Sequence, residues 1–251
     1  MSVLATRLTS RTFKESFGPL MHIILMGPQG SGKGTQSERI RTQLNLGSIA
    51  TGELFRAAIK GGTELGRRIQ AIYDRGELVP DELTVALVED RPAQLARERS
   101  QGAAIEGALY DGFPRTIAQA DALSRTLAAR GDEVTAVIAI DVPRQKLVER
   151  LAGRRVCSGC GRVYNVLSDP PAVAGVCDVC GGQLTQRADD TPEAVAKRLD
   201  LYDIETAPLL DRYEEQGLVE RVDGDRAIDD VTESIVAAIR GRMPLATVRA
   251  R

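Results

Sequence analysis

A glycine-rich stretch near the N-terminus constrains the fold of this sequence more than any other feature. Residues 27–35 read Gly-Pro-Gln-Gly-Ser-Gly-Lys-Gly-Thr and lie between an apolar run at 23–26 and a segment in which Ile40 and Leu44 have helical spacing. The apolar run predicts a buried parallel strand. A glycine turn between such a strand and a helix N-terminus is typical of a phosphate-binding loop, because backbone N–H groups and the helix dipole face an anion there. Lys33 completes the G-x-x-x-x-G-K pattern and can reach the outer phosphates of a nucleotide. A glycine turn that binds nothing is the alternative.

The composition argues against several classes of protein. With 251 residues, 43% of them hydrophobic, the chain can bury a large core in one or two domains. A net charge of −2 gives no electrostatic reason to expect binding to nucleic acid or to a membrane, and no apolar run is long enough to span a bilayer. Residues 1–20 carry Arg7, Arg11 and Lys14 and weakly resemble a transit peptide, but a disordered extension before Met21 is the simpler interpretation. We therefore expect a cytoplasmic protein.

Strand-like and helix-like segments alternate along most of the chain. Thr51 is predicted to cap the first of two short amphipathic helices, which Gly61 and Gly62 separate. The other predicted strands are residues 48–50, 104–110, 134–142 and 218–222, and the other predicted helices are 81–99, 117–130, one from residue 191 that Pro208 breaks or kinks, and 231–239. This alternation predicts an α/β fold, a parallel sheet with helices on both faces. Ligands bind at the carboxyl ends of such strands, where the phosphate-binding loop and residues 111–115 both fall.

Residues 153–190 differ in character from the rest and predict a small inserted domain. They contain all four cysteines of the chain, as Cys157-x₂-Cys160, sixteen residues, then Cys177-x₂-Cys180. This spacing is typical of a tetrahedral zinc site, and two disulfides are the alternative, which a reducing cytosol disfavours. Zinc would be structural here, because so short a segment cannot build a sufficient hydrophobic core. A zinc ribbon alone can bind nucleic acid, but the net charge and the 4% aromatic content argue against that role.

Four separated motifs occur in a fixed order along the chain. They are residues 27–36, 50–56 (Ala-Thr-Gly-Glu-Leu-Phe-Arg), 111–119 (Asp-Gly-Phe-Pro-Arg-Thr-Ile-Ala-Gln) and 153–156 (Gly-Arg-Arg-Val). Over about residues 21–240 the chain resembles the adenylate kinases that have a long lid, and Gly34 directly after the lysine fits that family. The resemblance implies a P-loop core with two inserted subdomains. The implied parts are an N-terminal extension at 1–20, the core at 21–49, 80–152 and 191–251 with a C-terminal tail, an AMP-binding part at 50–79 and a zinc-bearing lid at 153–190.

The resemblance implies the reversible reaction MgATP + AMP = 2 ADP and a role in adenine nucleotide homeostasis. The nucleophile of that reaction is a phosphate oxygen, so no general base is required. We interpret the single histidine, His22, which is predicted to lie just before the first strand, as structural. The reaction does require cations that offset the charge of two phosphate chains, and arginine provides one through a bidentate fork. The implied catalytic residues are Lys33, Asp111, Arg115, Arg154, Arg187 and Arg198, with Asp111 holding the waters of Mg²⁺.

The resemblance also implies a binding site for each nucleotide. The implied ATP site comprises Gly30, Ser31, Gly32, Lys33, Gly34, Thr35, Arg150, Arg154, Val163, Tyr164 and Arg226. The implied AMP site comprises Thr51, Arg56, Glu77, Leu78, Val79, Gly112, Phe113, Pro114, Arg115, Gln119, Arg187 and Arg198. Gln119 is implied to read the adenine edge, and local capping of the backbone is the alternative. Asp189 and Asp190 either fasten the lid or form a solvated pair.

Other functions fit only parts of the sequence. A P-loop switch protein that reads guanine would need an Asn-Lys-x-Asp motif, which the sequence lacks. A related kinase could accept UMP, CMP or GMP in place of AMP, or use GTP as the donor. We expect AMP as the acceptor, ATP as the donor and a monomeric protein, as the family resemblance implies.

Overall fold

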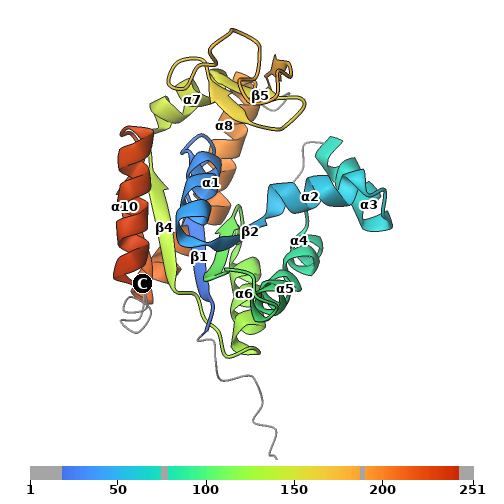
Figure 1. Cartoon of the computed structure of the whole chain (residues 1–251), viewed down its shortest axis with the longest axis vertical. Coiled ribbons are helices and arrows are strands. Elements are labelled where there is room, and N and C mark those ends of the chain that lie inside the picture. Colours follow the sequence, from blue (N-terminus) through green and yellow to red (C-terminus); the bar gives the residue numbers. More distant parts are fainter. Residues whose placement is uncertain (1–18, 75–78, 187–189, 243–251) are drawn as a thin grey trace, which may run out of the picture.

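A computed structural model describes residues 19–74, 79–186 and 190–242 of the chain, and a parallel sheet lies at its centre (Figure 1). The strands are β1 (Met21–Met26), β2 (Leu46–Ala50), β3 (Gly107–Asp111), β4 (Ala136–Asp141) and β8 (Val219–Asp223), in the spatial order β2-β3-β1-β4-β8. Every neighbouring pair is parallel. β1 is buried along its whole length, which explains why its sequence is apolar at every position except His22 rather than alternating. The predicted α/β fold is confirmed.

Helices cover both faces of this sheet, and each face has its own hydrophobic core. Successive side chains of a strand point to opposite faces, so Ile23 and Leu25 belong to one core and Ile24 and Met26 to the other. The first core is closed by α1 (Lys33–Leu44) and α10 (Ile228–Gly241), and the second by α4 (Asp81–Val88), α5 (Arg91–Ser100), α6 (Ile117–Ala128) and α9 (Pro208–Glu215). No helix in the described ranges combines the length and the apolar character needed to cross a membrane.

Two subdomains project from the carboxyl end of the sheet (Figure 1). The first, which we call the α2–α3 arm, follows β2 and consists of α2 (Thr51–Lys60) and α3 (Glu64–Asp74). The second, which we call the lid, lies between α7 (Arg144–Ala152) and α8 (Pro192–Leu201). The lid is an antiparallel sheet of β5 (Arg154–Cys157), β6 (Val163–Asn165) and β7 (Leu184–Thr185), in the order β6-β5-β7. The arm and the lid therefore lie at the end of the core where the phosphate-binding loop is.

Three local predictions are wrong. Residues 81–99 form two helices rather than one, because Pro92 lacks an N–H group and fits only the first turn of a new helix, α5. Thr51 is the first residue of α2 rather than its cap, and its hydroxyl donates to the Gly112 carbonyl oxygen instead. His22 lies inside β1, because the strand begins at Met21, which pairs with β3.

The predicted break near Pro208 is confirmed. Thr191 caps α8 through its hydroxyl, which accepts a hydrogen bond from the Ala194 N–H at 3.3 Å. A π-helical turn over Tyr202–Thr206 follows α8, and the Ala207 N–H donates to the Tyr202 carbonyl oxygen at 2.9 Å. α9 then begins at Pro208, whose ring is accommodated in a first helical turn.

Candidate active site

The phosphate-binding loop joins β1 to α1 at the carboxyl end of the sheet. Gly27, Gly30 and Gly32 have φ values of 147°, 88° and 96°, which only glycine adopts readily. A Cβ on Gly27 would lie 2.8 Å from the Ile140 carbonyl oxygen of the neighbouring strand, so this position has no room for a side chain. The first turn of α1 has neither a side-chain cap nor an acidic residue. Its N–H groups therefore suit an anion, as the sequence predicts.

Lys33, the first residue of α1, folds back over this loop. Its Nζ donates to the carbonyl oxygens of Gly27 at 2.6 Å and Pro28 at 3.0 Å. The hydroxyl of Ser31 is buried and has no hydrogen-bond partner among the described residues. A phosphate oxygen would give the Ser31 hydroxyl the partner that a buried polar group requires.

Charged side chains from four separate segments of the chain change the pKa of Lys33. The pKa of Lys33 is lowered to about 8, first by burial and then by the cations Arg115, Arg154 and Arg198, whereas the Asp111 carboxylate acts in the opposite direction. Asp111 ends β3, Arg115 lies in the loop before α6, Arg154 begins the lid strand β5 and Arg198 belongs to α8. The fold thus brings five of the six implied catalytic residues to one place.

Arg154 is held at the base of the lid by a buried carboxylate. Its Nε donates to Asp190 Oδ2 at 2.8 Å, and its Nη2 donates to Asp190 Oδ1, which makes the pair bidentate. The Asp190 side chain is 0% exposed and that of Arg154 is 14% exposed. Because these residues flank the lid on its two sides, their contact joins the two chain segments through which the lid leaves the core. Asp190 is therefore not part of a solvated pair.

The other side of the site lies between the α2–α3 arm and the loop after β3. The Thr51 hydroxyl donates to the Gly112 carbonyl oxygen at 3.0 Å, and Arg115 Nε donates to the same oxygen at 2.9 Å. Phe113 and Pro114 are buried, whereas the guanidinium-bearing side chains of Arg56 and Arg115 are exposed. The loop thus presents Arg115 over two buried residues, and Arg56 of α2 adds a second exposed cation. Four of the residues predicted for the site or for fastening the lid lie outside the described ranges: Glu77, Leu78, Arg187 and Asp189.

Gln119 is buried at the start of α6 and is held by polar groups at both ends of its carboxamide. Its Oε1 accepts from the Arg115 N–H at 2.8 Å, and its Nε2 donates to Asp81 Oδ1 at 2.7 Å. The other carboxylate oxygen of Asp81 accepts from the Thr116 hydroxyl at 2.7 Å. Local capping by Gln119 therefore occurs, but among the described residues no partner uses the second N–H group or the second oxygen lone pair of its carboxamide.

The residues implied to bind the ATP base lie around the junction of α7, β6 and the loop after β8. Arg150 Nη2 donates to the Gly224 carbonyl oxygen at 2.9 Å, which joins α7 to that loop. Arg226 Nη1 donates to Ser234 Oγ at 3.1 Å, and Val163 is 45% exposed. Tyr164, by contrast, is 2% exposed and packs inside the lid. Contact of Tyr164 with a bound nucleotide is thus limited to its backbone.

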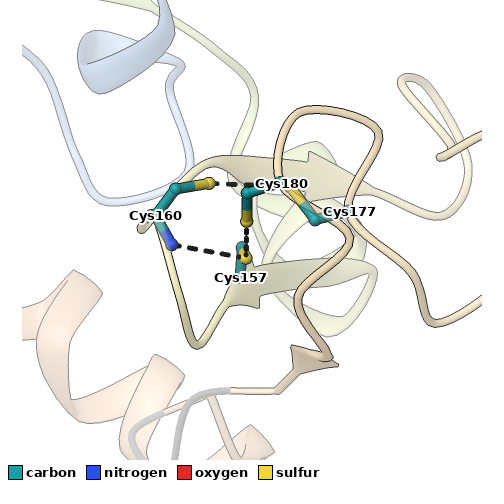
Figure 2. A group of neighbouring side chains, drawn as sticks. All are labelled: Cys157, Cys160, Cys177 and Cys180. Carbon is teal, nitrogen blue, oxygen red and sulfur yellow. Dashed lines mark hydrogen bonds between the residues drawn. The ribbon is translucent and has the colours of Figure 1, made fainter.

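The four cysteine sulfurs point toward one another inside the lid (Figure 2). All four Sγ atoms lie within 4.8 Å of one another, with Cys157 and Cys180 at 3.4 Å and Cys160 and Cys177 at 3.6 Å. These separations are too long for disulfides and are near the ~3.8 Å between sulfurs around a tetrahedral zinc ion. The pKa of the Cys177 thiol is lowered to about 6, first by the Tyr164 hydroxyl, which contacts Sγ at 3.4 Å, and then by nearby backbone N–H groups. The donor set therefore fits zinc.

The sheet, the phosphate-binding loop and the gathered arginines define a P-loop phosphoryl transferase. A sequence model described as "Adenylate kinase" matches residues 25–218 of the chain. The chain belongs to the adenylate kinase family, a family of nucleoside monophosphate kinases. It is similar to the adenylate kinase of Carboxydothermus hydrogenoformans, with 49% identity over 88% of this chain and 100% of that protein. It is also similar to the adenylate kinases of Moorella thermoacetica (49% identity, 87% and 98% coverage) and Staphylococcus aureus (46% identity, 86% and 97% coverage).

The sequence did not single out Asp81, although this residue holds the Gln119 carboxamide. An acidic residue in the first turn of a helix is common because it offsets the helix dipole, so nothing local distinguishes Asp81 from Glu82 beside it. Its contact partners follow 35 and 38 residues later. Only the packing of α4 against α6 reveals the contact.

Proposed function

We propose that this chain catalyses MgATP + AMP = 2 ADP and thereby balances the adenine nucleotides of the cell. The observation that carries the proposal is the gathering of Lys33, Arg115, Arg154 and Arg198 beside the phosphate-binding loop. A protein that only binds one nucleotide has no need for so many cations from separate elements. An enzyme that joins two phosphate chains must offset their mutual repulsion and the charge of the transferring group.

The donor side of the proposed site is the P-loop with the lid. Residues 30–35 hold the ATP phosphates through N–H groups, and Lys33 bridges the donor and transferred groups. Asp111 holds waters of the Mg²⁺ ion, which arrives with ATP and neutralises phosphate charge. Arg150 and Val163 lie against the adenine of ATP, and the backbones of Tyr164 and Arg226 complete this subsite. ATP is the proposed donor, and GTP is the alternative.

The acceptor side is the α2–α3 arm with the loop after β3. We propose that Thr51, Arg56, residues 77–79 and residues 112–115 hold AMP, with Arg115 clamping its phosphate. Gln119 reads the adenine edge with the N–H group and lone pair that its local contacts leave unused. Arg154, Arg187 and Arg198 then surround the transferring group. The acceptor oxygen is an ionised phosphate oxygen, so no residue needs to remove a proton.

We further propose that residues 50–79 and 153–190 close over the substrates, because water competes with AMP as an acceptor. A mimic that links the two nucleotides should slow hydrogen exchange in both segments, and ATP alone should slow it mainly in 153–190. Residues 228–241, the far-side helix α10, serve as the internal reference. Protection confined to the P-loop would contradict closure.

The lid is proposed to bind one structural zinc ion through Cys157, Cys160, Cys177 and Cys180. Metal analysis of the purified protein should give about one zinc per chain, and a chelator should loosen the lid before the core. Cys160→Ser should lose the metal, whereas Ser158→Ala, in the same turn, should retain it. Metal-free protein with four titratable thiols would contradict the proposal. We also propose that the protein is a cytoplasmic monomer. Size-exclusion chromatography with light scattering tests its oligomeric state.

A coupled assay of ADP formation from ATP and AMP tests the proposed reaction. Activity should need both nucleotides and Mg²⁺, and AMP should exceed UMP, CMP and GMP in kcat/KM by at least about a hundredfold. Arg115→Ala should lower kcat/KM by about a hundredfold or more. Arg212→Ala is the matched control, because Arg212 pairs with Asp121 at 2.6 Å on α6, outside the proposed site. Equal use of the pyrimidine monophosphates would overturn the acceptor assignment, and a donor panel with GTP resolves the donor.

A further inference from the structure

The Gln119 carboxamide can adopt only one orientation in its surroundings. A backbone N–H group can only donate, so the atom that faces the Arg115 N–H must be the amide oxygen. A carboxylate can only accept, so the atom that faces Asp81 must be the amide nitrogen. The two neighbours impose the same orientation from opposite ends. The unused N–H group and the unused lone pair of Gln119 consequently have fixed positions.

We propose that Asp81 is a specificity-determining positioning residue, which fixes the Gln119 carboxamide so that its free edge matches adenine and rejects a 6-oxopurine. The inference rests on the proposed acceptor, AMP. Adenine presents a 6-amino donor beside the N1 acceptor, whereas a 6-oxopurine presents an oxygen acceptor beside an N1–H donor. A carboxamide in one fixed orientation complements the first edge and opposes the second. A carboxamide that is free to rotate by 180° complements either edge.

The surroundings of Asp81 favour this positioning role. Asp81 lies in the first turn of α4, directly after the α2–α3 arm returns to the core, and its side chain is half-buried. Its second oxygen accepts from the Thr116 hydroxyl at 2.7 Å, so the carboxylate itself is held at two points. The Thr116 hydroxyl also accepts a hydrogen bond from the backbone N–H of Gln119 at 3.2 Å. The side chain that orients Gln119 is therefore itself oriented, as a precise recognition site requires.

The test uses AMP and inosine monophosphate (IMP) as acceptors at saturating MgATP, because the two differ only at the edge that Gln119 faces. Asp81→Asn keeps the shape of the side chain but can either accept from the carboxamide or donate to it, so the constraint at Nε2 is lost and the orientation rests on the Arg115 N–H alone. The ratio of kcat/KM for AMP to that for IMP should fall about tenfold, the equivalent of one hydrogen bond of ~1.4 kcal/mol. The change should come from a higher KM for AMP, with kcat within about threefold of wild type, because Asp81 touches no reacting group.

Two matched variants separate positioning from a loss of charge or of stability. Glu82→Gln removes a charge from the same helical turn at an exposed position and should leave the AMP to IMP ratio unchanged. Thr116→Val removes the contact at the other oxygen of Asp81 and the cap of α6, so it should lower the melting temperature without inverting the preference for AMP. If Asp81→Asn folds poorly, Asp81→Ser poses the same question, because its shorter side chain removes the contact that orients Nε2.

The outcomes distinguish this inference from the proposed function. A wild-type enzyme that uses AMP and IMP equally well would overturn the proposed adenine recognition, and this inference with it. A wild-type enzyme that prefers AMP, with an unchanged AMP to IMP ratio in both Asp81 variants, would overturn this inference alone and leave Asp81 as a structural link between α4 and α6. A lower ratio in the Asp81 variants, with unchanged KM for ATP and an unchanged ratio in Glu82→Gln, would support it.

Discussion

Lys33→Met is expected to change stability and activity in opposite directions. The ammonium group of Lys33 is partly buried among three arginines, and its pKa is lowered to about 8 from an ordinary value of 10.5. A lowered lysine pKa means that the charge destabilises the folded chain. Methionine keeps the length of the side chain without the charge. The variant should therefore gain stability relative to wild type near pH 7, while turnover falls by about a hundredfold or more because the phosphates lose a cation.

The size of this stability difference, and its dependence on pH, follow from the proton linkage between folding and the ionisation of Lys33. Between pH 8 and pH 10.5 the unfolded chain retains a proton on Lys33 that the folded chain has lost, so the stability of the wild type rises with pH. From pH 7 to pH 9.5 this rise amounts to about 2 kcal/mol, an upper value because Lys33 keeps some contact with solvent. The methionine side chain of the variant cannot titrate. The advantage of the variant over wild type should accordingly shrink by up to that amount over the same interval.

Urea unfolding at pH 7, 8, 9 and 9.5, followed by circular dichroism, measures this difference. The hydrogen bonds of Lys33 to Gly27 and Pro28 are lost in the variant at every pH. Their loss therefore shifts the unfolding free energy of the variant by a constant amount and does not change how it depends on pH. Lys33→Arg is the control, because arginine retains its charge throughout and should also lack the pH-dependent gain. Unfolding free energies of wild type and Lys33→Met that run parallel from pH 7 to pH 9.5 would refute the reasoning.

Three further perturbations test other parts of the structure. Asp190→Asn leaves the Arg154 guanidinium without its buried carboxylate, which should cost about 3 kcal/mol and speed hydrogen exchange at the base of the lid. His22 is buried and its pKa is lowered by that burial, so the unfolding free energy of wild type should fall as the pH drops below 6.5, and His22→Gln should flatten this dependence in urea titrations. Leu123→Ala, in the core between α6 and the sheet, should cost about 2–5 kcal/mol in the same measurement without raising the KM for AMP.

The parts of the fold that the sequence predicts best are those whose cause is local. The phosphate-binding loop is specified by glycines at positions that need positive φ, next to a strand that is apolar because it is buried on both faces. The cysteine pairs are equally local, since each C-x₂-C turn brings two thiols close together within four residues. The sequence does not predict the order of the strands, but it does predict the edge at which the site lies, because the carboxyl ends of parallel strands share one edge of the sheet.

Boundaries were harder to predict where tertiary contacts override local preference. The helical periodicity of residues 81–99 continues through Glu89 and Asp90, yet the chain turns there so that α4 packs on α6 while α5 packs on β3. Thr51 has the side chain of a helix cap, but the Gly112 carbonyl oxygen lies within reach and takes its hydroxyl. In both cases the deciding partner lies far away in the sequence, and a local pattern contains no information about it.

The same reasoning explains why Arg115 and Arg154 are predicted from the sequence, whereas Asp190 stays open there between two alternatives and Asp81 is not singled out. Arg115 and Arg154 stand in recognisable motifs, one in the loop after β3 and the other at the start of β5, and the guanidinium of each suits a phosphate. Asp190 and Asp81 only have to bring a carboxylate within hydrogen-bond distance of Arg154 and Gln119, respectively. Many positions in a connecting segment or in the first turn of a helix could supply such a carboxylate. Their identity is set by the distance between two elements after packing. Positioning residues of this kind become visible only when the hydrogen-bond partners of each site residue are traced outward through the structure.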